Sequence, residues 1–271
     1  DVISTYAEII NGEQQPVYLY KYASALLHLN AEAYYLTQFN GDWAAEVGMT
    51  ESRLGFGKKI IDSNLGTRTN MFASPFFVLS LEKNAEENTG KALIGTLGWT
   101  GNFRFTFEVD HENKLRVISG INPYNSKYEL KVGETFKTPD FIFTYSERGT
   151  GEASRNIHSW ARRHRIKDGQ GERLTLLNNW EATYFDFNEK KIIALIDEAK
   201  TLGLDMFLLD DGWFGNKYPR NNDNAGLGDW QPNKKKLPNG LNALTAATAK
   251  KGIKFGLWIE TEMVNPKSEL I

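Results

Sequence analysis

The sequence predicts two parts of different architecture: an antiparallel β sandwich in the first half, and alternating β-strands and α-helices in the second. Residues 103–109 alternate strictly between apolar and polar side chains, and this period of two is typical of a strand with one buried face. From residue 174 onward, short apolar runs alternate instead with segments of helical periodicity. Such alternation indicates parallel strands joined by right-handed helical crossovers.

The first half contains several further segments with strand character, separated by turn signals. These expected strands cover residues 76–81, 92–99, 115–118, 128–132 and 141–145. Short strands at this spacing predict an antiparallel sandwich over residues 1–150. A helix is expected over 152–166 because its apolar residues recur at helical spacing, and a glycine-containing segment then breaks the chain. We therefore place a linking helix and loop at 151–172.

Three β/α units are expected over residues 173–271. Their strands are expected at 174–178, 206–211 and 255–260, with helices at about 188–202 and 241–251 between them. Asp186 and Glu189 resemble a capping pair before the first helix, and Gly203 stands where a C-terminal cap belongs. Residues 267–271 have the pattern of a further helix. Because a closed barrel needs eight strands, we expect the chain to be the start of a barrel in a longer protein.

Composition excludes several classes of function. With 32 basic against 34 acidic residues, the chain has no excess charge for nucleic acid or an anionic membrane. The absence of Cys excludes a thiolate nucleophile and a Cys zinc site, and the four His form no metal pair at helical spacing. No apolar run reaches the ~18 residues of a transmembrane helix. We expect no metal, no cofactor, and the cytoplasm rather than the periplasm or secretion.

The ends of the three expected parallel strands carry the candidate site. Asp210, Asp211 and Trp213 follow the second strand, Trp180 follows the first, and Trp258 lies in the third. In such folds the strand ends converge on the ligand. Carboxylates accept hydrogen bonds from sugar hydroxyls, and an indole ring covers the apolar face of a pyranose. The pattern predicts a sugar site, against the alternative that an Asp caps the loop and Trp213 packs over it as a lid.

Other residues near these strand ends are candidates for supporting roles. Glu260 and Glu262 are two positions apart and either face the sugar or brace the strand end through salt bridges. The loop after the second strand adds Asp229 and Trp230. Glycoside hydrolysis needs two carboxyl groups that flank the scissile bond. The adjacent carboxylates at 210 and 211 cannot be that pair, because successive strand residues point to opposite faces.

Several motifs, in order, resemble glycoside hydrolase family 36, which contains the microbial α-galactosidases. They lie at 179–182, 209–215, 227–230, 236–241 and 255–266, with further similarity at 119–123 and 133–139. The resemblance implies the end of an N-terminal β-supersandwich followed by the first three units of a (β/α)8 barrel. It implies that Asp210 and Asp211 bind the galactose hydroxyls O4 and O6, and that Trp180 and Trp258 line the same subsite. Thr261 departs from the family, which usually has Pro there.

The resemblance also defines what this chain is expected to do. The family's nucleophile and acid/base, both Asp, have no counterpart in it, so we assign no catalytic residue here. The chain is expected to be part of a retaining α-galactosidase that acts on oligosaccharides such as melibiose and raffinose, with possible homo-oligomers of the whole enzyme. Two alternatives stay open: an α-N-acetylgalactosaminidase of the same family, and a non-catalytic sugar-binding module.

Overall fold

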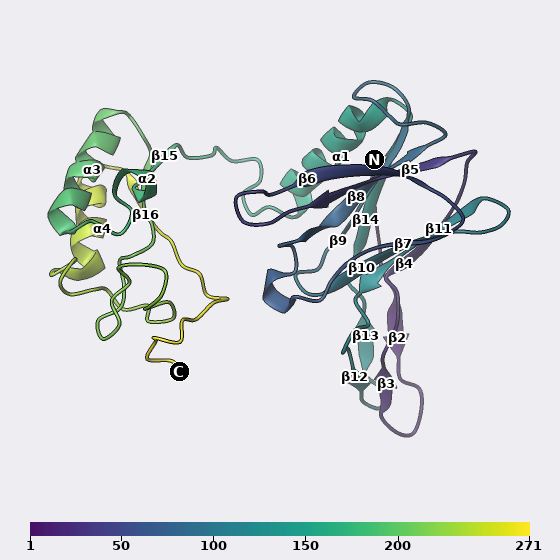
Figure 1. Cartoon of the computed structure of the whole chain (residues 1–271), viewed down its shortest axis with the longest axis horizontal. Helices are drawn as coiled ribbons and strands as arrows, with labels where there is room; N and C mark the ends of the chain where they lie inside the picture. The colour runs from purple at the N-terminus through teal and green to yellow at the C-terminus, as the bar shows by residue number, and fades with distance from the viewer. The chain divides into compact units, whose positions relative to one another are not determined.

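The computed structural model describes all residues 1–271 and contains two compact units, Asp1–Gln170 and Gly171–Ile271. The first unit is a sandwich of two antiparallel sheets (Figure 1). The six-stranded sheet has the order β1 (Val2–Thr5), β14 (Phe141–Ser146), β9 (Lys91–Leu97), β8 (Ala73–Leu81), β5 (Tyr34–Asn40) and β6 (Gly48–Leu54). The four-stranded sheet has the order β4 (Ala25–Asn30), β11 (Lys114–Ile121), β10 (Phe103–Val109) and β7 (Gly57–Ser63).

The alternation of residues 103–109 produces the core of this sandwich. Phe103, Phe105, Phe107 and Val109 of β10 are each at most 2% exposed, and they face the opposite sheet. Phe77 of that sheet packs edge-on against Phe105 and Phe107, with ring centroids 5.2 and 4.8 Å apart. Burying a side chain of this size contributes about 1.5–3 kcal/mol. The predicted strand at 103–109 and its buried face are confirmed.

Two short ribbons extend from the sandwich as an arm (Figure 1). In one, β2 (Glu8–Ile10) pairs with β13 (Thr135–Lys137); in the other, β3 (Val17–Leu19) pairs with β12 (Tyr128–Leu130). The expected strand at 128–132 therefore belongs to the arm and not to the sandwich. Its pairing partner lies more than 100 residues earlier in the chain, which local periodicity does not encode.

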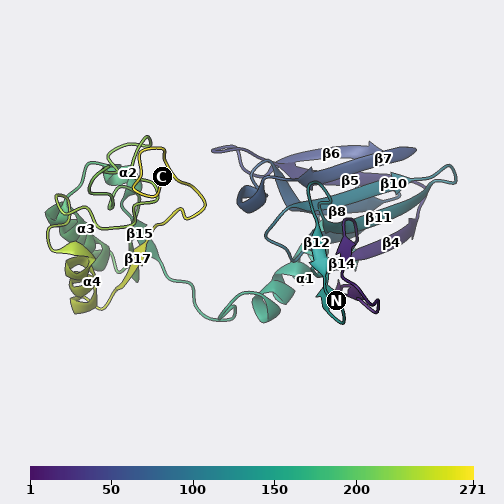
Figure 2. The same cartoon turned by 90° about the horizontal axis from the view of Figure 1, so that it is seen from below.

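The helix expected at 152–166 forms as α1 (Gly149–His164) and packs on β9 and β14 of the six-stranded sheet (Figure 1 and Figure 2). It begins at Gly149, three residues earlier than expected. Gly149 has a φ of +81°, and a Cβ there would lie 2.4 Å from the carbonyl oxygen of Glu86, so this position requires Gly. Ala153 contacts Ala92 and Ile94 of the sheet. The helix thus belongs to the first unit. A 3₁₀ turn, Gly66–Arg68, completes the elements of this unit.

The second unit contains a parallel sheet of β15 (Leu176–Asn178), β16 (Met206–Leu209) and β17 (Lys254–Leu257), with β16 in the centre. The helices are α2 (Trp180–Thr183), α3 (Glu189–Thr201) and α4 (Gly240–Lys250). Ile192 and Ile196 of α3 and Leu244 of α4 share a core with Phe207 and Leu209 of β16. The expected alternation of parallel strands and helices is confirmed, and Gly203 follows α3 with a φ of +75°.

Three local expectations in this unit are wrong. Asn188 caps α3 by accepting the Lys191 backbone N–H at 3.0 Å, whereas the side chain of Asp186 is fully exposed. The second and third strands end two and three residues early, at Leu209 and Leu257, which form the last pair of the ladder between them. Residues 267–271 form turns and no helix. The hydroxyl of Ser268 accepts the backbone N–H of Leu270 in this segment, in place of a helical turn.

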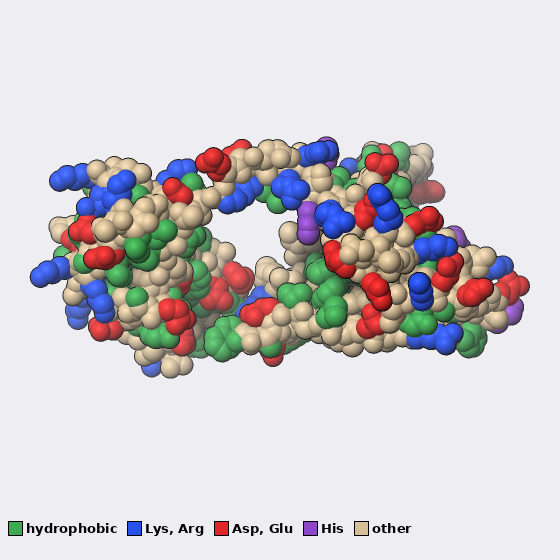
Figure 3. Space-filling model, turned by 90° about the horizontal axis from the view of Figure 1, so that it is seen from above, with side chains coloured by type: hydrophobic (Ala, Val, Ile, Leu, Met, Phe, Trp, Pro, Cys, Tyr) green, Lys and Arg blue, Asp and Glu red, His purple; other side chains and the backbone are tan.

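The surface carries charges of both signs. Figure 3 shows acidic and basic side chains interspersed over the face that it presents, without a large field of one sign. This agrees with the formal net charge of −2. No helix of the structure has the length and apolar character that spanning a membrane requires.

Candidate functional site

The candidate site is built around residues 210–212, a turn that directly follows the central strand β16. Two Asn side chains at the end of the neighbouring strand β15 hold Asp210 in place. The side-chain amide of Asn178 donates to Asp210 Oδ2 at 2.5 Å, and the Asn179 side-chain oxygen accepts the Asp210 backbone N–H at 2.8 Å. Asn179 is fully buried and Asp210 half-buried. Asp210 is therefore held once at its backbone and once at its carboxylate, which still reaches solvent.

Asp211 lies in a different environment, where it forms a buried ion pair with Arg220. The guanidinium donates from Nε to both carboxylate oxygens at 3.0 Å and from Nη2 to Oδ2 at 2.7 Å. The side chains are 8% and 5% exposed. Oδ1 of Asp211 also accepts the Gly212 backbone N–H at 2.6 Å. All of the acceptor positions of this carboxylate are thus in use within the protein.

Lys236 contacts the same turn from the long loop that precedes α4. Its Nζ donates to the carbonyl oxygens of Gly212 at 2.8 Å, Phe185 at 2.9 Å and Arg220 at 3.2 Å. Burial lowers the pKa of the Lys236 ammonium to about 8, and the nearby Asp211 carboxylate opposes that shift. The 210–212 turn is therefore held by one guanidinium and one ammonium group.

The predicted aromatic residues differ in how much ring surface they expose. Trp180 is half-buried, with its ring edge-on to Phe185 at 5.0 Å between centroids. Trp258 and Trp230 are also half-buried and pack against each other at 6.3 Å. Trp213 is only 2% exposed, and its Nε1 donates to the Trp258 carbonyl at 3.0 Å. This geometry favours packing for Trp213 and leaves Trp180 and Trp258 with surface that a ligand can reach.

The three carboxylates predicted to have supporting roles, those of Glu260, Glu262 and Asp229, form no hydrogen bond with the 210–212 turn. Glu260 is half-buried and Glu262 is exposed, and neither side chain forms a salt bridge. Asp229 is 7% exposed and accepts from the Ser268 hydroxyl at 2.7 Å and from the Glu269 backbone N–H at 2.8 Å. Asp229 thus fastens the 267–271 segment to the long loop, and its part in ligand binding stays a prediction.

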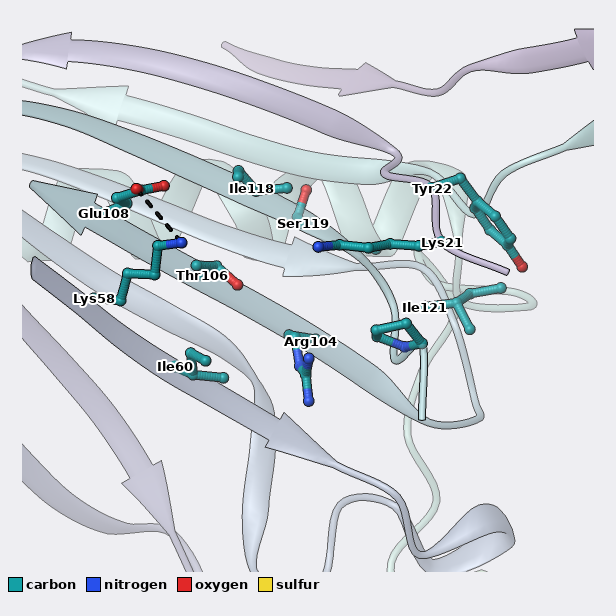
Figure 4. A pocket seen from close by; sticks show the side chains of 12 residues that line it. Lys21, Tyr22, Lys58, Ile60, Arg104, Thr106, Glu108, Ile118, Ser119 and Ile121 are labelled. Atoms are coloured by element: carbon teal, nitrogen blue, oxygen red, sulfur yellow. Dashed lines mark ion pairs between the residues drawn. The ribbon is translucent and has the colours of Figure 1, made fainter. Parts of the chain in front are cut away.

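A separate pocket lies on the outer face of the four-stranded sheet in the first unit. Its lining includes Lys21, Tyr22, Lys58, Arg104 and Glu108 (Figure 4). Lys58 pairs with Glu108 at 3.5 Å, and Arg104 pairs with an Asp of the neighbouring strand at 2.6 Å. None of the sequence-predicted site residues lies in this pocket. No cluster of His, Asp or Glu in the chain has the arrangement of a metal site.

Arg220 and Lys236 were missed by reasoning from the sequence. Both lie in the loop between β16 and α4, which has no periodicity to indicate which side chains turn inward. One signal was available, because a carboxylate at the end of a buried strand needs a cationic partner. Local sequence alone does not say which of the several Lys and Arg residues in that loop is the partner.

Comparison with known proteins identifies the family. The model of the Glycosyl hydrolase family 36 N-terminal domain matches residues 1–131, and the Melibiase model matches residues 135–271, half of the chain. The chain belongs to glycoside hydrolase family 36. The two models meet between residues 131 and 135, so the Melibiase match includes α1 together with the whole second unit.

Individual relatives in family 36 match the chain along its whole length. Alpha-galactosidase Mel36A of Lactobacillus acidophilus is 39% identical over 271 residues, which cover 99% of this chain and 36% of that protein. The crystal structure of an alpha-galactosidase from Lactobacillus brevis has a TM-score of 0.92 at 37% identity, covering 100% of this chain and 36% of that one. A variant of alpha-galactosidase AgaA from Geobacillus stearothermophilus, crystallised with raffinose, has a TM-score of 0.91 at 36% identity, covering 99% and 37%. The chain thus spans a little over a third of these relatives.

Proposed function

We propose that the whole protein is a retaining α-galactosidase and that this chain supplies part of its galactose-binding site. The observation that carries the proposal is the match, over the whole chain, to alpha-galactosidases that include one crystallised with raffinose. Terminal α-linked galactose of oligosaccharides such as raffinose is accordingly the proposed substrate. We also propose that the three parallel strands begin a (β/α)8 barrel, and that the sandwich is part of the family's β-supersandwich. Assembly of the whole enzyme into homo-oligomers stays a prediction.

The geometry of Asp210 supports its role as a sugar ligand. One of its oxygens accepts the Asp211 backbone N–H at 2.7 Å and the other accepts from Asn178. A carboxylate has about four acceptor positions, so two remain for hydroxyl groups. Hydroxyl donors form charge-assisted bonds with an ionised carboxylate, which are the stronger class of hydrogen bond. Asp210 is thus oriented and only partly satisfied, as a binding group must be.

The carboxylate of Asp211 differs from that of Asp210 in how it can bind a sugar hydroxyl. A hydroxyl group that binds its carboxylate shares or replaces one of the donors already present, because Arg220 and Gly212 occupy its acceptor positions. We therefore propose that Asp210 contributes more to galactose affinity than Asp211. Trp180 and Trp258 would cover apolar parts of the sugar. Glu260, near the end of the third strand, would have a supporting role.

The residues of this chain would bind and orient the sugar and would not cleave it. In a retaining hydrolase a carboxylate attacks the anomeric carbon, and a second carboxyl group protonates the leaving oxygen and later activates water. By its resemblance to the family, this chain has no counterpart of those two Asp residues. Its contribution to rate is then the positioning of galactose through bonds that strengthen in the transition state.

The test is Asp210→Ala in the whole protein, with an aryl α-galactoside as substrate. Loss of charge-assisted bonds worth about 1.5–3 kcal/mol should lower kcat/KM by at least ~10-fold. Asp205→Ala is the matched control, because Asp205 lies beside the same strand at its opposite end and bonds to Thr175. Wild-type protein that cleaves no α-galactoside, or prefers an aryl α-N-acetylgalactosaminide, would overturn the assigned activity. Equal kcat/KM in the two variants would overturn the assigned site.

A further inference from the structure

The side chain of Lys236 joins three separate segments at the candidate site. Phe185 follows α2, Gly212 follows β16, and Arg220 lies in the long loop before α4. Their carbonyl oxygens all accept from the same Nζ, at 2.9, 2.8 and 3.2 Å. An ammonium group has three N–H donors, so each is used once. Lys236 therefore ties the turn to two other parts of the unit through backbone acceptors alone.

The backbone around Lys236 is fixed, so this side chain is directed at the turn. The buried Asn233 side chain accepts the Lys236 backbone N–H at 3.1 Å and donates to the Gly215 carbonyl at 2.7 Å. Leu237, the next residue, is 1% exposed. The Phe187 ring lies 4.7 Å from Nζ and supplies a cation–π contact. Both ends of the Lys236 side chain are therefore held.

The carbonyl that Lys236 bonds in the turn belongs to a residue of unusual conformation. Gly212 has a φ of +93°, and a Cβ there would lie 3.0 Å from Phe185 and 3.3 Å from the Arg220 carbonyl oxygen. The turn is thus packed against the same two segments that Lys236 joins. Asn179 fixes the other end of the turn at the backbone of Asp210. Between these two points the course of the chain determines where the Asp210 carboxylate stands.

We propose that Lys236 is a positioning residue that holds the 210–212 turn in the shape that presents Asp210 to galactose. This inference rests on the proposed function for the identity of the ligand, and on the three carbonyl contacts for the positioning itself. Arg should reproduce these three bonds poorly, because its donors form a rigid planar fork, whereas the ammonium of Lys is a compact group with three rotatable donors. Met keeps the length of the side chain but leaves all three carbonyls without this donor.

The variants that test the proposal are Lys236→Met and Lys236→Arg, with Lys235→Met as the matched control. Lys235 is the preceding residue, is exposed, and its side chain forms no hydrogen bond or salt bridge. All three are compared with the wild type at a temperature where each is folded. The Arg variant keeps the charge and the apolar stem, and so remains informative where the Met variant fails to fold.

The first measurement is amide hydrogen exchange of residues 211–213 in the chain without ligand. Exchange should be at least ~10-fold faster in both Lys236 variants and unchanged in Lys235→Met, since the Gly212 N–H bond to Asp211 depends on the shape of the turn. The second is the split between KM and kcat for an aryl α-galactoside in the whole protein. We expect KM to rise several-fold and kcat/KM to fall at least ~10-fold, as for loss of an oriented ligand.

The two readouts separate this proposal from the proposed function. Exchange rates and kcat/KM equal to those of Lys235→Met would overturn the positioning role, whatever the substrate. Faster exchange in a protein that neither binds nor cleaves α-galactosides would support the hold on the turn and overturn the assigned ligand. A lowered melting temperature with unchanged exchange, KM and kcat would show that Lys236 serves stability alone.

Discussion

Replacing Arg220 with Met should destabilise the second unit more than any other single loss of charge in it. Arg220 and Asp211 are nearly inaccessible to water and share three hydrogen bonds. Removing the guanidinium leaves the Asp211 carboxylate buried without its main partner, and breaking a buried ion pair from one side costs about 3–5 kcal/mol. In a unit of this size each kcal/mol lowers the melting temperature by about 4–8 °C. The melting temperature should therefore fall by at least ~12 °C.

The control removes a second ion pair of Arg220, in which Nη2 pairs with Asp223 at 3.2 Å. The Asp223 side chain is 81% exposed, and exposed pairs contribute about 0–1 kcal/mol. Asp223→Ala should therefore melt almost like the wild type. The double variant Arg220→Met, Asp211→Leu should regain part of the lost stability, since it leaves no unpaired charge.

Differential scanning calorimetry of the chain can measure these effects on the second unit's transition. We expect one transition for each of the two compact units, because small single domains usually unfold cooperatively. A melting temperature for Arg220→Met within a few degrees of that for Asp223→Ala would refute the account of a buried, energetically coupled pair. A double variant less stable than Arg220→Met would refute the explanation through an unpaired carboxylate.

Three further expectations concern other parts of the structure. Gly95→Ala should destabilise the first unit by about 1–3 kcal/mol in urea unfolding, because its Cβ would lie 2.5 Å from the Phe77 ring in the core; an unchanged urea midpoint would contradict this. The pKa of Lys236 is lowered to about 8 in the folded chain from an ordinary 10.5, so between these pH values the unfolded chain binds more protons. The free energy of unfolding of the wild type should therefore rise from pH 8 to 10 by about 1 kcal/mol more than that of Lys236→Met, after allowance for solvent screening. An equal rise in the variant would contradict a lowered pKa of Lys236. Asn178→Ala should lower kcat/KM of the whole protein by about 10-fold, because Asp210 loses an orienting donor, and wild-type kinetics would show that the amide has no such role.

Much of the local structure could be predicted from the sequence because it depends on neighbours in the chain. The alternation at 103–109 places every second side chain on one face of β10, whatever lies opposite. The apolar stripe of α3 and the glycine after it likewise depend on residues within a few positions. The cap of α3 was misassigned even so, since Asn188, Asp186 and Glu189 all have suitable side chains and only the path of the preceding loop selects among them.

The candidate site also has one part that could be predicted from the sequence and one part that could not. The sequence by itself determined that carboxylates and indoles follow short apolar strands, and hence that Asp210, Trp180 and Trp258 lie at the strand ends. Only the tertiary structure decided that Asp211 is buried against Arg220, that Trp213 is covered, and that Lys236 reaches the turn. Strand and helix patterns repeat with a fixed period, so a residue's direction can be read from its position in the chain. A long loop has no period, and its side chains are directed by packing against segments that are distant in sequence.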